Sequence, residues 1–242
     1  AYLARKQLNG MDGNFHWHGF ETRDELASAF ADVVAGRLAK AIAVRGEALL
    51  AVSGGTTPAK FFAALSTRPI AWNKVTVTLI DERFVPMASP RSNAALVAVN
   101  LLQNAASAAK FVPLYHEAES IEAAAFAANS DLRKLAWPLD AAVLGMGNDG
   151  HTASFFSDAQ GLTGLLDPAA ESTVLPVHAA SAGEPRLTLP MARIVAARFV
   201  ALHIEGAEKH MTFESAMGAG VKKPIRTVID ASPKPIEVFW AP

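Results

Sequence analysis

Short, continuously apolar runs alternate along the chain with longer segments in which apolar residues recur every three or four positions. The runs predict buried strands, and the longer spacing predicts amphipathic helices. Continuous apolar strands that alternate with helices are typical of an α/β protein with a mainly parallel sheet. The predicted strands cover residues 48–52, 75–80, 141–144, 172–177, 199–204 and 236–240, and residues 186–190 form a further approach to the sheet. The predicted helices begin near Thr22, Pro58, Ser92, Ser120 and Ala207.

Two of these helix starts carry recognisable capping residues. Thr22 and Glu25 have the spacing of a capping box, in which side chain and backbone satisfy each other at the first turn. Pro58 suits the first turn of the next helix, so Thr56 or Thr57 is the predicted N-cap.

Residues 15–20 alternate between apolar and polar side chains, as in an exposed strand. His16 and His18 would then share one face and could together hold a metal ion. Because no third ligand stands nearby in the sequence, the pattern favours two ordinary surface histidines over a metal site.

Composition narrows the classes of protein to which this chain can belong. Its 242 residues, 51% of them hydrophobic, contain no linker or repeat, so we expect a single domain over residues 1–242. A net charge of −1 argues against a nucleic-acid surface, and no run reaches the ~18 apolar residues of a membrane span. The chain has no cysteine, which excludes disulfides and thiol catalysis. Ala1 to Lys6 also lack the apolar core of a secretion signal, so we expect a cytoplasmic protein.

Ser53-Gly54-Gly55-Thr56 follows the strand 48–52 and precedes a helix. Two glycines and several hydroxyls at a helix N-terminus can form a phosphate cradle, because the backbone N–H groups are unobstructed and the helix dipole favours an anion. The loop lacks the Gly-Lys-Ser/Thr of a Walker motif. The alternative is an ordinary turn between a strand and a helix.

Two further charged segments lie where α/β folds bind ligands. Asp81, Glu82 and Arg83 directly follow the strand 75–80, at the carboxyl end of the sheet, although a solvated loop of charges is equally compatible. Lys209 lies in the predicted first turn of a helix, where a cation is unfavourable unless an anion is bound beside it.

Within residues 141–156, a predicted buried strand is followed directly by three glycines, a histidine and a threonine. Gly145 to Gly150 also fits the dinucleotide pattern G-x-G-x-x-G, which requires a helix and then an acidic residue at the end of the next strand. Gly161 and Gly164 interrupt that helix, and Glu171 opens the next strand instead of closing it. A nucleotide site is therefore disfavoured, and His151 is the candidate for chemistry.

Taken together, these segments resemble the 6-phosphogluconolactonases, within the superfamily that also contains the glucosamine-6-phosphate isomerases. The resemblance implies a Rossmann-like, mostly parallel sheet with helices on both faces. The sequence departs from the usual pattern of the family at Asn148, Phe155, Ser157 and Pro190. Of these, Pro190 disturbs the stretch that carries Arg186. The matching blocks are Ser53–Pro58, Asp81–Pro86 with Ser92-Asn93, Gly145–Phe156, Arg186–Leu189 and Gly206–Lys209.

Two features distinguish the nearest activities within that superfamily. Arg83 stands where the isomerases and deaminases have a tyrosine, and the block from His151 reads His-Thr-Ala-Ser-Phe-Phe, nearer the lactonase form. The alternatives are an aldose–ketose isomerase or deaminase, which Arg83 disfavours, and a non-enzymatic sugar-phosphate sensor. A sensor would normally carry a basic DNA-binding module, and none is evident.

The resemblance implies hydrolysis of 6-phospho-D-glucono-1,5-lactone to 6-phospho-D-gluconate in the oxidative pentose phosphate pathway. A lactone is an activated ester, so the reaction needs a base for water and a site for the oxyanion, without a cofactor or metal. His151 is the predicted base, with Asp149 orienting it, and a helix starting behind Gly150 would favour its neutral form. We expect a phosphosugar lactone as the partner, and a monomer or small homo-oligomer. Arg83 is the predicted partner of the oxyanion, and Asp81 is predicted to fix the Arg83 guanidinium. The resemblance implies that the phosphate lies on Ser53, Gly54, Gly55 and Thr56 with Arg186 and Lys209.

Overall fold

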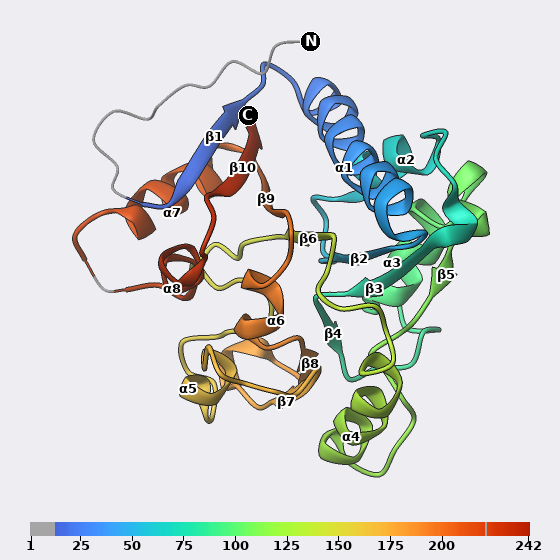
Figure 1. Ribbon diagram of the computed structural model, residues 1–242. Helices are drawn as coiled ribbons and strands as arrows, with labels where there is room; N and C mark the ends of the chain where they lie inside the picture. Colours follow the sequence, from blue (N-terminus) through green and yellow to red (C-terminus); the bar gives the residue numbers. More distant parts are fainter. Residues whose placement is uncertain (1–12, 221) are drawn as a thin grey trace.

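The computed structural model describes residues 13–220 and 222–242 (Figure 1). Ala1 to Lys6, on which the expectation about a secretion signal rests, lie outside the described residues. A seven-stranded sheet runs through the centre, and each of its strand pairs is parallel. In spatial order its strands are β1 (Phe15–Gly19), β10 (Ile236–Ala241), β9 (Val200–Glu205), β6 (Ala141–Leu144), β2 (Ala48–Val52), β3 (Val75–Leu79) and β5 (Lys110–Phe111).

Helices cover both faces of this sheet, as predicted, and alternate residues of β10 show how (Figure 1). Phe239 stacks on Phe30 of α1 on one face. Trp240 faces the other way and contacts His210 of α7. The structure thereby confirms the predicted α/β, Rossmann-like arrangement. The helices are α1 (Arg23–Arg45), α2 (Ala59–Ser66), α3 (Asn93–Asn100), α4 (Ile121–Leu132), α5 (Leu162–Leu165), α6 (Met191–Val195), α7 (Ala207–Met217) and α8 (Pro224–Ala231), with short 3-10 turns at Trp72–Lys74, Asn104–Ala108 and Ala180–Ala182.

A second, three-stranded antiparallel sheet corrects the sequence interpretation. It consists of β4 (Asp81–Arg83), β8 (Arg186–Thr188) and β7 (Leu175–Val177). The charges after β3 are therefore not a solvated loop, and the two later segments do not join the main sheet. Ile80 links the two sheets, because its N–H donates to Val52 and its carbonyl accepts from Leu189, at 2.9 and 2.8 Å. Pro190 follows β8 and precedes α6, so it leaves the strand of Arg186 intact.

The helix caps agree with the sequence in one case and differ in the other. Thr22 accepts a hydrogen bond from the Glu25 N–H at 3.2 Å, at the start of α1. The predicted cap at Thr56 or Thr57 is wrong, because α2 begins at Ala59 and Pro58 occupies the cap position without a side-chain bond. The leading N–H groups of α2 therefore receive no side-chain acceptor from the cap residue.

The prediction for the two N-terminal histidines is also wrong in part. His18 is buried, and both rings bond to the same carboxylate, that of Glu237 on β10. The distances are 3.0 Å from His16 and 2.5 Å from His18. Parallel pairing of β1 with β10 brings the three side chains to one face of the sheet.

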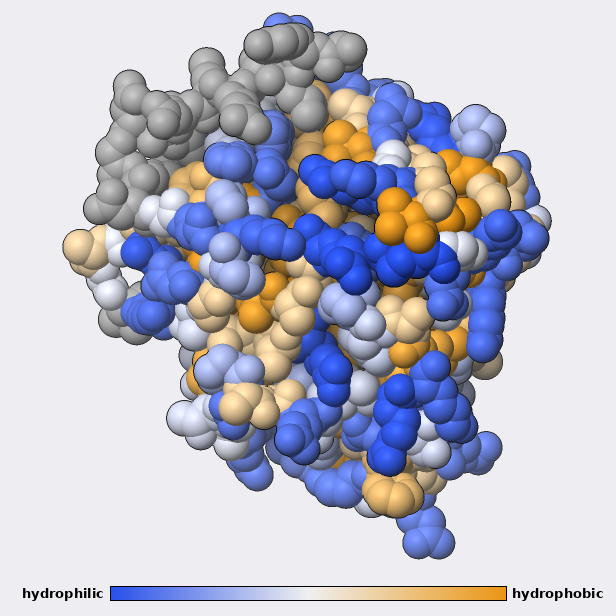
Figure 2. Space-filling model, in the orientation of Figure 1, coloured by the Kyte–Doolittle hydropathy of each residue, from blue (hydrophilic) through white to orange (hydrophobic). Residues whose placement is uncertain are grey.

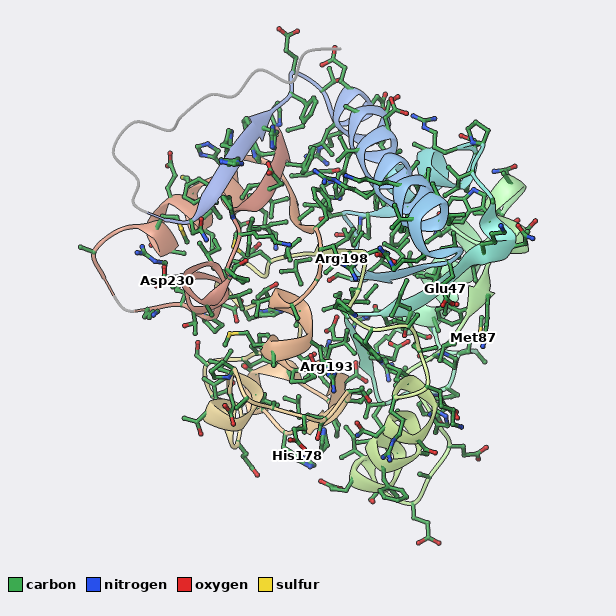
Figure 3. All side chains as sticks on the ribbon, in the orientation of Figure 1. Glu47, Met87, His178, Arg193, Arg198 and Asp230 are labelled. Atoms are coloured by element: carbon green, nitrogen blue, oxygen red, sulfur yellow. The ribbon has the colours of Figure 1, made fainter. Side chains whose placement is uncertain are left out.

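A buried carboxylate ties together the amino ends of three central strands. Asp140, just before β6, accepts a hydrogen bond from the Leu49 N–H of β2 at 2.9 Å. It also pairs with Arg45 and, at 3.4 Å, with Arg198, which precedes β9 and is labelled in Figure 3. These contacts lie at the amino ends of the strands. The candidate site lies at the opposite, carboxyl ends, so the charges of Asp140, Arg45 and Arg198 are not part of it.

The outer surface on the side drawn in Figure 2 is largely hydrophilic, with small and separate apolar patches. None of the described helices combines the length and the apolar character needed to cross a membrane.

Candidate functional site

A pocket of about 290 Å³ opens at the carboxyl ends of the central parallel strands. The segment after β2, the turn after β6, strands β4 and β8, the end of β9 and the start of α7 all contribute to it. The predicted site residues that line it are Ser53, Gly54, Gly55, Thr56, Asp81, Arg83, His151, Arg186 and Lys209. Asp149, the remaining predicted residue, is not among the lining residues but contacts His151.

The imidazole of His151 is oriented by Asp149. Oδ1 of Asp149 lies 2.6 Å from Nδ1 of the ring and 3.2 Å from the His151 backbone nitrogen. Burial by itself would raise the pKa of Asp149, but its contacts with the His151 N–H and imidazole outweigh burial and lower that pKa. With Nδ1 engaged, Nε2 is the ring nitrogen that can take a proton.

The backbone around this pair is determined by glycine. A Cβ atom on Gly147 would overlap the ring of His151 and lie 2.5 Å from Asp149 Oδ1. The turn closes with hydrogen bonds from the Gly147 N–H to the His151 carbonyl and from the Gly150 N–H to the Gly147 carbonyl, at 2.9 and 3.0 Å. The predicted helix behind Gly150 is wrong, because turns follow until α5 begins at Leu162.

The loop after β2 packs directly against this turn. The Ser53 hydroxyl accepts a hydrogen bond from the Gly145 N–H at 3.2 Å. Gly54 has no room for a Cβ, which would overlap the Asn93 amide. Gly55 has a φ of 94°, which residues with side chains rarely adopt. The loop therefore presents bare backbone to the pocket immediately ahead of α2, in a form suited to an anion.

Two arginines face each other across the small sheet. Arg83 on β4 and Arg186 on β8 are direct partners in the antiparallel register, and both line the pocket. Each makes one hydrogen bond to a backbone carbonyl, Arg83 to Arg91 at 2.5 Å and Arg186 to Ala182 at 3.1 Å. The Nε atoms of both are buried without a partner among the described residues. Burial lowers the pKa of the Arg186 guanidinium, although the charge of Asp81 opposes that effect.

The neighbouring carboxylates have structural partners. Asp81 accepts a hydrogen bond from the buried Ser154 hydroxyl at 2.7 Å, and no hydrogen bond or ion pair joins it to Arg83 in the part of the chain described. The predicted role of Asp81 in fixing Arg83 is therefore not the arrangement seen. Glu82 points to the opposite face of β4, is fully buried, and accepts bonds at the start of α3, including those from the Asn93 and Ala94 N–H groups at 2.8 Å.

Lys209 lies in the first turn of α7, as predicted, and its ammonium group donates to the Met146 carbonyl beside the glycine turn. Burial lowers the pKa of this lysine, and the nearby charges of Glu208 and Asp149 act in the opposite direction. A partly buried cation held over the pocket rim is a ready partner for an anion.

The lining residues that were missed as site candidates include Asn93 and His203. Asn93 donates to the Asp81 carbonyl at 2.9 Å and packs on Gly54. His203 lies near the end of β9. The sequence held a signal for each, since Asn93 stands in one of the blocks that carried the resemblance and His203 interrupts an otherwise apolar strand.

Comparisons with known proteins agree over nearly the whole chain. Residues 21–240 match the family described as glucosamine-6-phosphate isomerases/6-phosphogluconolactonase. The 6-phosphogluconolactonase of Mesorhizobium japonicum is 65% identical over 240 residues, covering 99% of this chain and 100% of that protein. That of Rhizobium meliloti is 50% identical over 227 residues, covering 93% and 98%. The crystal structure of a 6-phosphogluconolactonase from Shewanella baltica has a TM-score of 0.92 at 36% identity, covering 96% of this chain and 100% of that one.

Proposed function

Because the chain belongs to the family of glucosamine-6-phosphate isomerases and 6-phosphogluconolactonases, we propose that it hydrolyses 6-phospho-D-glucono-1,5-lactone with His151 as the base. It is an enzyme of the carboxylic ester hydrolase class, and the reaction is a step of the pentose phosphate pathway. The observation that supports the role of His151 most directly is its bond to Asp149 at the wall of a pocket that also contains two arginines.

In the proposed reaction, Nε2 of His151 removes a proton from water while the water oxygen bonds to the lactone carbonyl carbon. The carbonyl oxygen becomes an oxyanion, which needs a positive partner in a site already shaped for it. When the intermediate collapses, the bond from that carbon to the ring oxygen breaks, and the ring oxygen takes the proton from the imidazole. The product acid then ionises, so each turnover releases one proton to solution.

The paired arginines suit the oxyanion because their guanidinium groups are already fixed. Arg83 is held by its bond to the Arg91 carbonyl, and the Arg186 guanidinium lies 5.5 Å over the ring of Phe156. Phe156 in turn packs against His151 with the ring centroids 4.3 Å apart. The base and Arg186 are thus in contact with one aromatic ring, which favours a common role at the reacting carbon.

The 6-phosphate is assigned to the loop of Ser53, Gly54, Gly55 and Thr56 with Lys209, whereas Arg186, which the sequence interpretation placed with the phosphate, is reassigned to the oxyanion. The loop offers bare backbone ahead of α2, and Lys209 adds a positive charge near the neighbouring turn. Binding of this remote dianion would hold the lactone carbonyl near His151, so binding energy far from the reacting bond contributes to the rate.

The deciding experiment is acid release from 6-phosphogluconolactone generated in situ, corrected for spontaneous hydrolysis. His151→Ala should lose turnover by ~10²–10⁴, the range for a general base, while binding of 6-phosphogluconate survives. His178→Ala is the matched control, because that histidine is exposed, bonds to Glu122 at 2.6 Å and lies outside the pocket (Figure 3).

Acid release that persists at the wild-type rate in His151→Ala would move the base elsewhere. Absence of release from the wild type would contradict lactone hydrolysis itself, and the isomerase assay would then be the next measurement.

A further inference from the structure

His203 is a buried histidine in the pocket that the proposed reaction does not use. It lies on β9, with 3% of its surface exposed. Its Nε2 atom is 3.0 Å from Glu205 Oε1, whereas its Nδ1 atom is buried without a partner among the described residues. A polar atom buried without a hydrogen bond costs stability, so a partner supplied by a ligand would offset that cost.

The orientation of the ring is fixed on two sides. Phe30 and Phe61 contact it edge-on, with centroids 5.5 and 5.9 Å away. Glu205 is held in turn by Arg23, whose Nε lies 3.4 Å from its second carboxylate oxygen. A ring flip would leave the Glu205 carboxylate without its donor, so Nδ1 stays on the side away from that carboxylate.

The same contacts determine what Nδ1 can do. The Glu205 carboxylate accepts from both Arg23 and the imidazole, so the proton of a neutral imidazole lies on Nε2. Nδ1 is then an acceptor, and the group that completes its bonding must be a donor. In a pocket assigned to a polyhydroxylated sugar, the hydroxyl groups of the bound substrate are donors of this kind.

A second histidine provides an internal comparison. His18 is also buried, bonds to Glu237 through Nε2, and has an Nδ1 atom without a partner in the described part of the chain. It does not line the pocket, whereas His203 does. Burial beside a carboxylate is thus common to both, and the position beside the pocket is particular to His203.

We propose that Nδ1 of His203 accepts a hydrogen bond from a hydroxyl group of the bound sugar and so contributes to the selection of the substrate. The proposal rests on the proposed function, because the hydroxyl belongs to the sugar part of that substrate. It adds a contact to a residue that lines the pocket and that is separate from the charges assigned to the phosphate and the oxyanion.

Two substitutions distinguish this contact from a purely structural role. His203→Gln keeps an amide near the position of Nε2, and therefore the Glu205 contact, but removes the acceptor at Nδ1. His203→Asn places an amide oxygen near Nδ1 and loses the Glu205 contact. We expect His203→Gln to raise KM for the lactone about tenfold, the effect of one hydrogen bond, with kcat within about twofold, and His203→Asn to raise KM by no more than about threefold.

Calorimetry with 6-phosphogluconate and with inorganic phosphate supplies a readout that does not depend on turnover. His203→Gln should bind 6-phosphogluconate about tenfold more weakly and inorganic phosphate as the wild type does. Equal losses for both ligands, or a milder effect of Gln than of Asn, would overturn the proposal in favour of a structural histidine. Missing lactone turnover in the wild type would instead contradict the proposed function, and the binding comparison would still decide the role of His203.

Nitrogen NMR of the imidazoles in the wild type tests the same contact without relying on the folding of a variant. The Nδ1 resonance of His203 should shift as 6-phosphogluconate is added and remain in place with inorganic phosphate. A resonance that responds to neither ligand would overturn the proposal.

Discussion

Asp149 and His151 are joined twice, by a 2.6 Å contact to the ring nitrogen and a 3.2 Å bond to the backbone nitrogen of the same residue. The carboxylate thus sets both the rotation of the imidazole and the path of the turn that carries it. Two residues with one residue between them act as a single unit, and a substitution at either changes the other.

Asp149→Asn should lower kcat by about 10- to 100-fold with little change in KM. An asparagine amide can donate to Nδ1, which would place the ring proton on Nε2 and remove the base. Because the pKa of Asp149 is below its usual range, the wild-type carboxylate stays ionised in mildly acidic buffer, where the variant's deficit should persist. Asp131→Asn, which alters a similar contact with His116 outside the pocket, is the control for the rate assay. An unchanged kcat in Asp149→Asn would show that Asp149 does not orient the base.

Lys209→Met should raise KM for the phosphorylated lactone by about tenfold or more and change KM for unphosphorylated gluconolactone little. Burial lowers the pKa of Lys209, so as pH rises its charge is lost before that of an exposed lysine. The affinity of the wild type for the phosphorylated lactone should therefore decline on the alkaline side, and the variant should lack this decline. The exposed Lys60→Met is the matched control. An equal loss toward both lactones would contradict the phosphate role.

Gly147→Ala should lower kcat by at least about tenfold, because the added Cβ would overlap the His151 ring and displace the proposed general base. Gly36→Ala, an exposed position in α1 with open space around its Cβ, should leave turnover unchanged and raise the free energy of unfolding by about 0.4–1 kcal/mol. Urea unfolding and the acid-release assay on both variants separate stability from catalysis. Normal turnover in Gly147→Ala would mean that the turn adapts without moving the base.

Glu82→Gln should reduce the free energy of unfolding by about 1–3 kcal/mol, because an amide nitrogen would face N–H or O–H donors that the carboxylate now accepts. Burial raises the pKa of Glu82 despite these bonds. Its stabilising contribution is therefore complete at pH values below the ordinary pKa of glutamate. That contribution is lost as pH rises through the raised pKa of Glu82 in the folded protein. In urea titrations, the difference in unfolding free energy between the wild type and Glu82→Gln should become smaller as pH rises over that range. A difference that becomes larger would contradict this pH dependence. Glu47→Gln, at an exposed position, is the control (Figure 3).

The main sheet could be predicted because its central strands are buried on both faces and are therefore continuously apolar. Ala48–Val52 and Ala141–Leu144 are fully buried, as such runs require. The loop proposed to bind the phosphate and His151 were also identifiable, because parallel topology brings the carboxyl ends of these strands to one edge. The convergence of most candidate residues in one pocket follows from that geometry.

The small sheet as a unit could not be predicted, although the segments that form β7 and β8 were read as strands, because the signal for β4 is not in its own residues. Asp81–Arg83 contains only charged side chains, and it becomes a strand because β8 pairs with it and Glu82 enters a site made by α3. His203 was missed for a related reason. A single polar residue within an apolar strand, such as His203 in β9, indicates that its side chain is buried. The pattern does not indicate its role, because that depends on the loop that packs against it.

The link at Ile80 has a consequence for how sequences of this kind can diverge. With a single residue between β3 and β4, side chains alternate so that Asp81 and Arg83 face the pocket and Glu82 faces α3. One inserted or deleted residue would reverse that alternation, sending Glu82 toward the ligand and Arg83 into the space beside α3. Point substitutions at Ile80 change packing alone, whereas a change of length there exchanges the two faces. The length of this segment is therefore coupled to the orientation of the side chains that face the pocket.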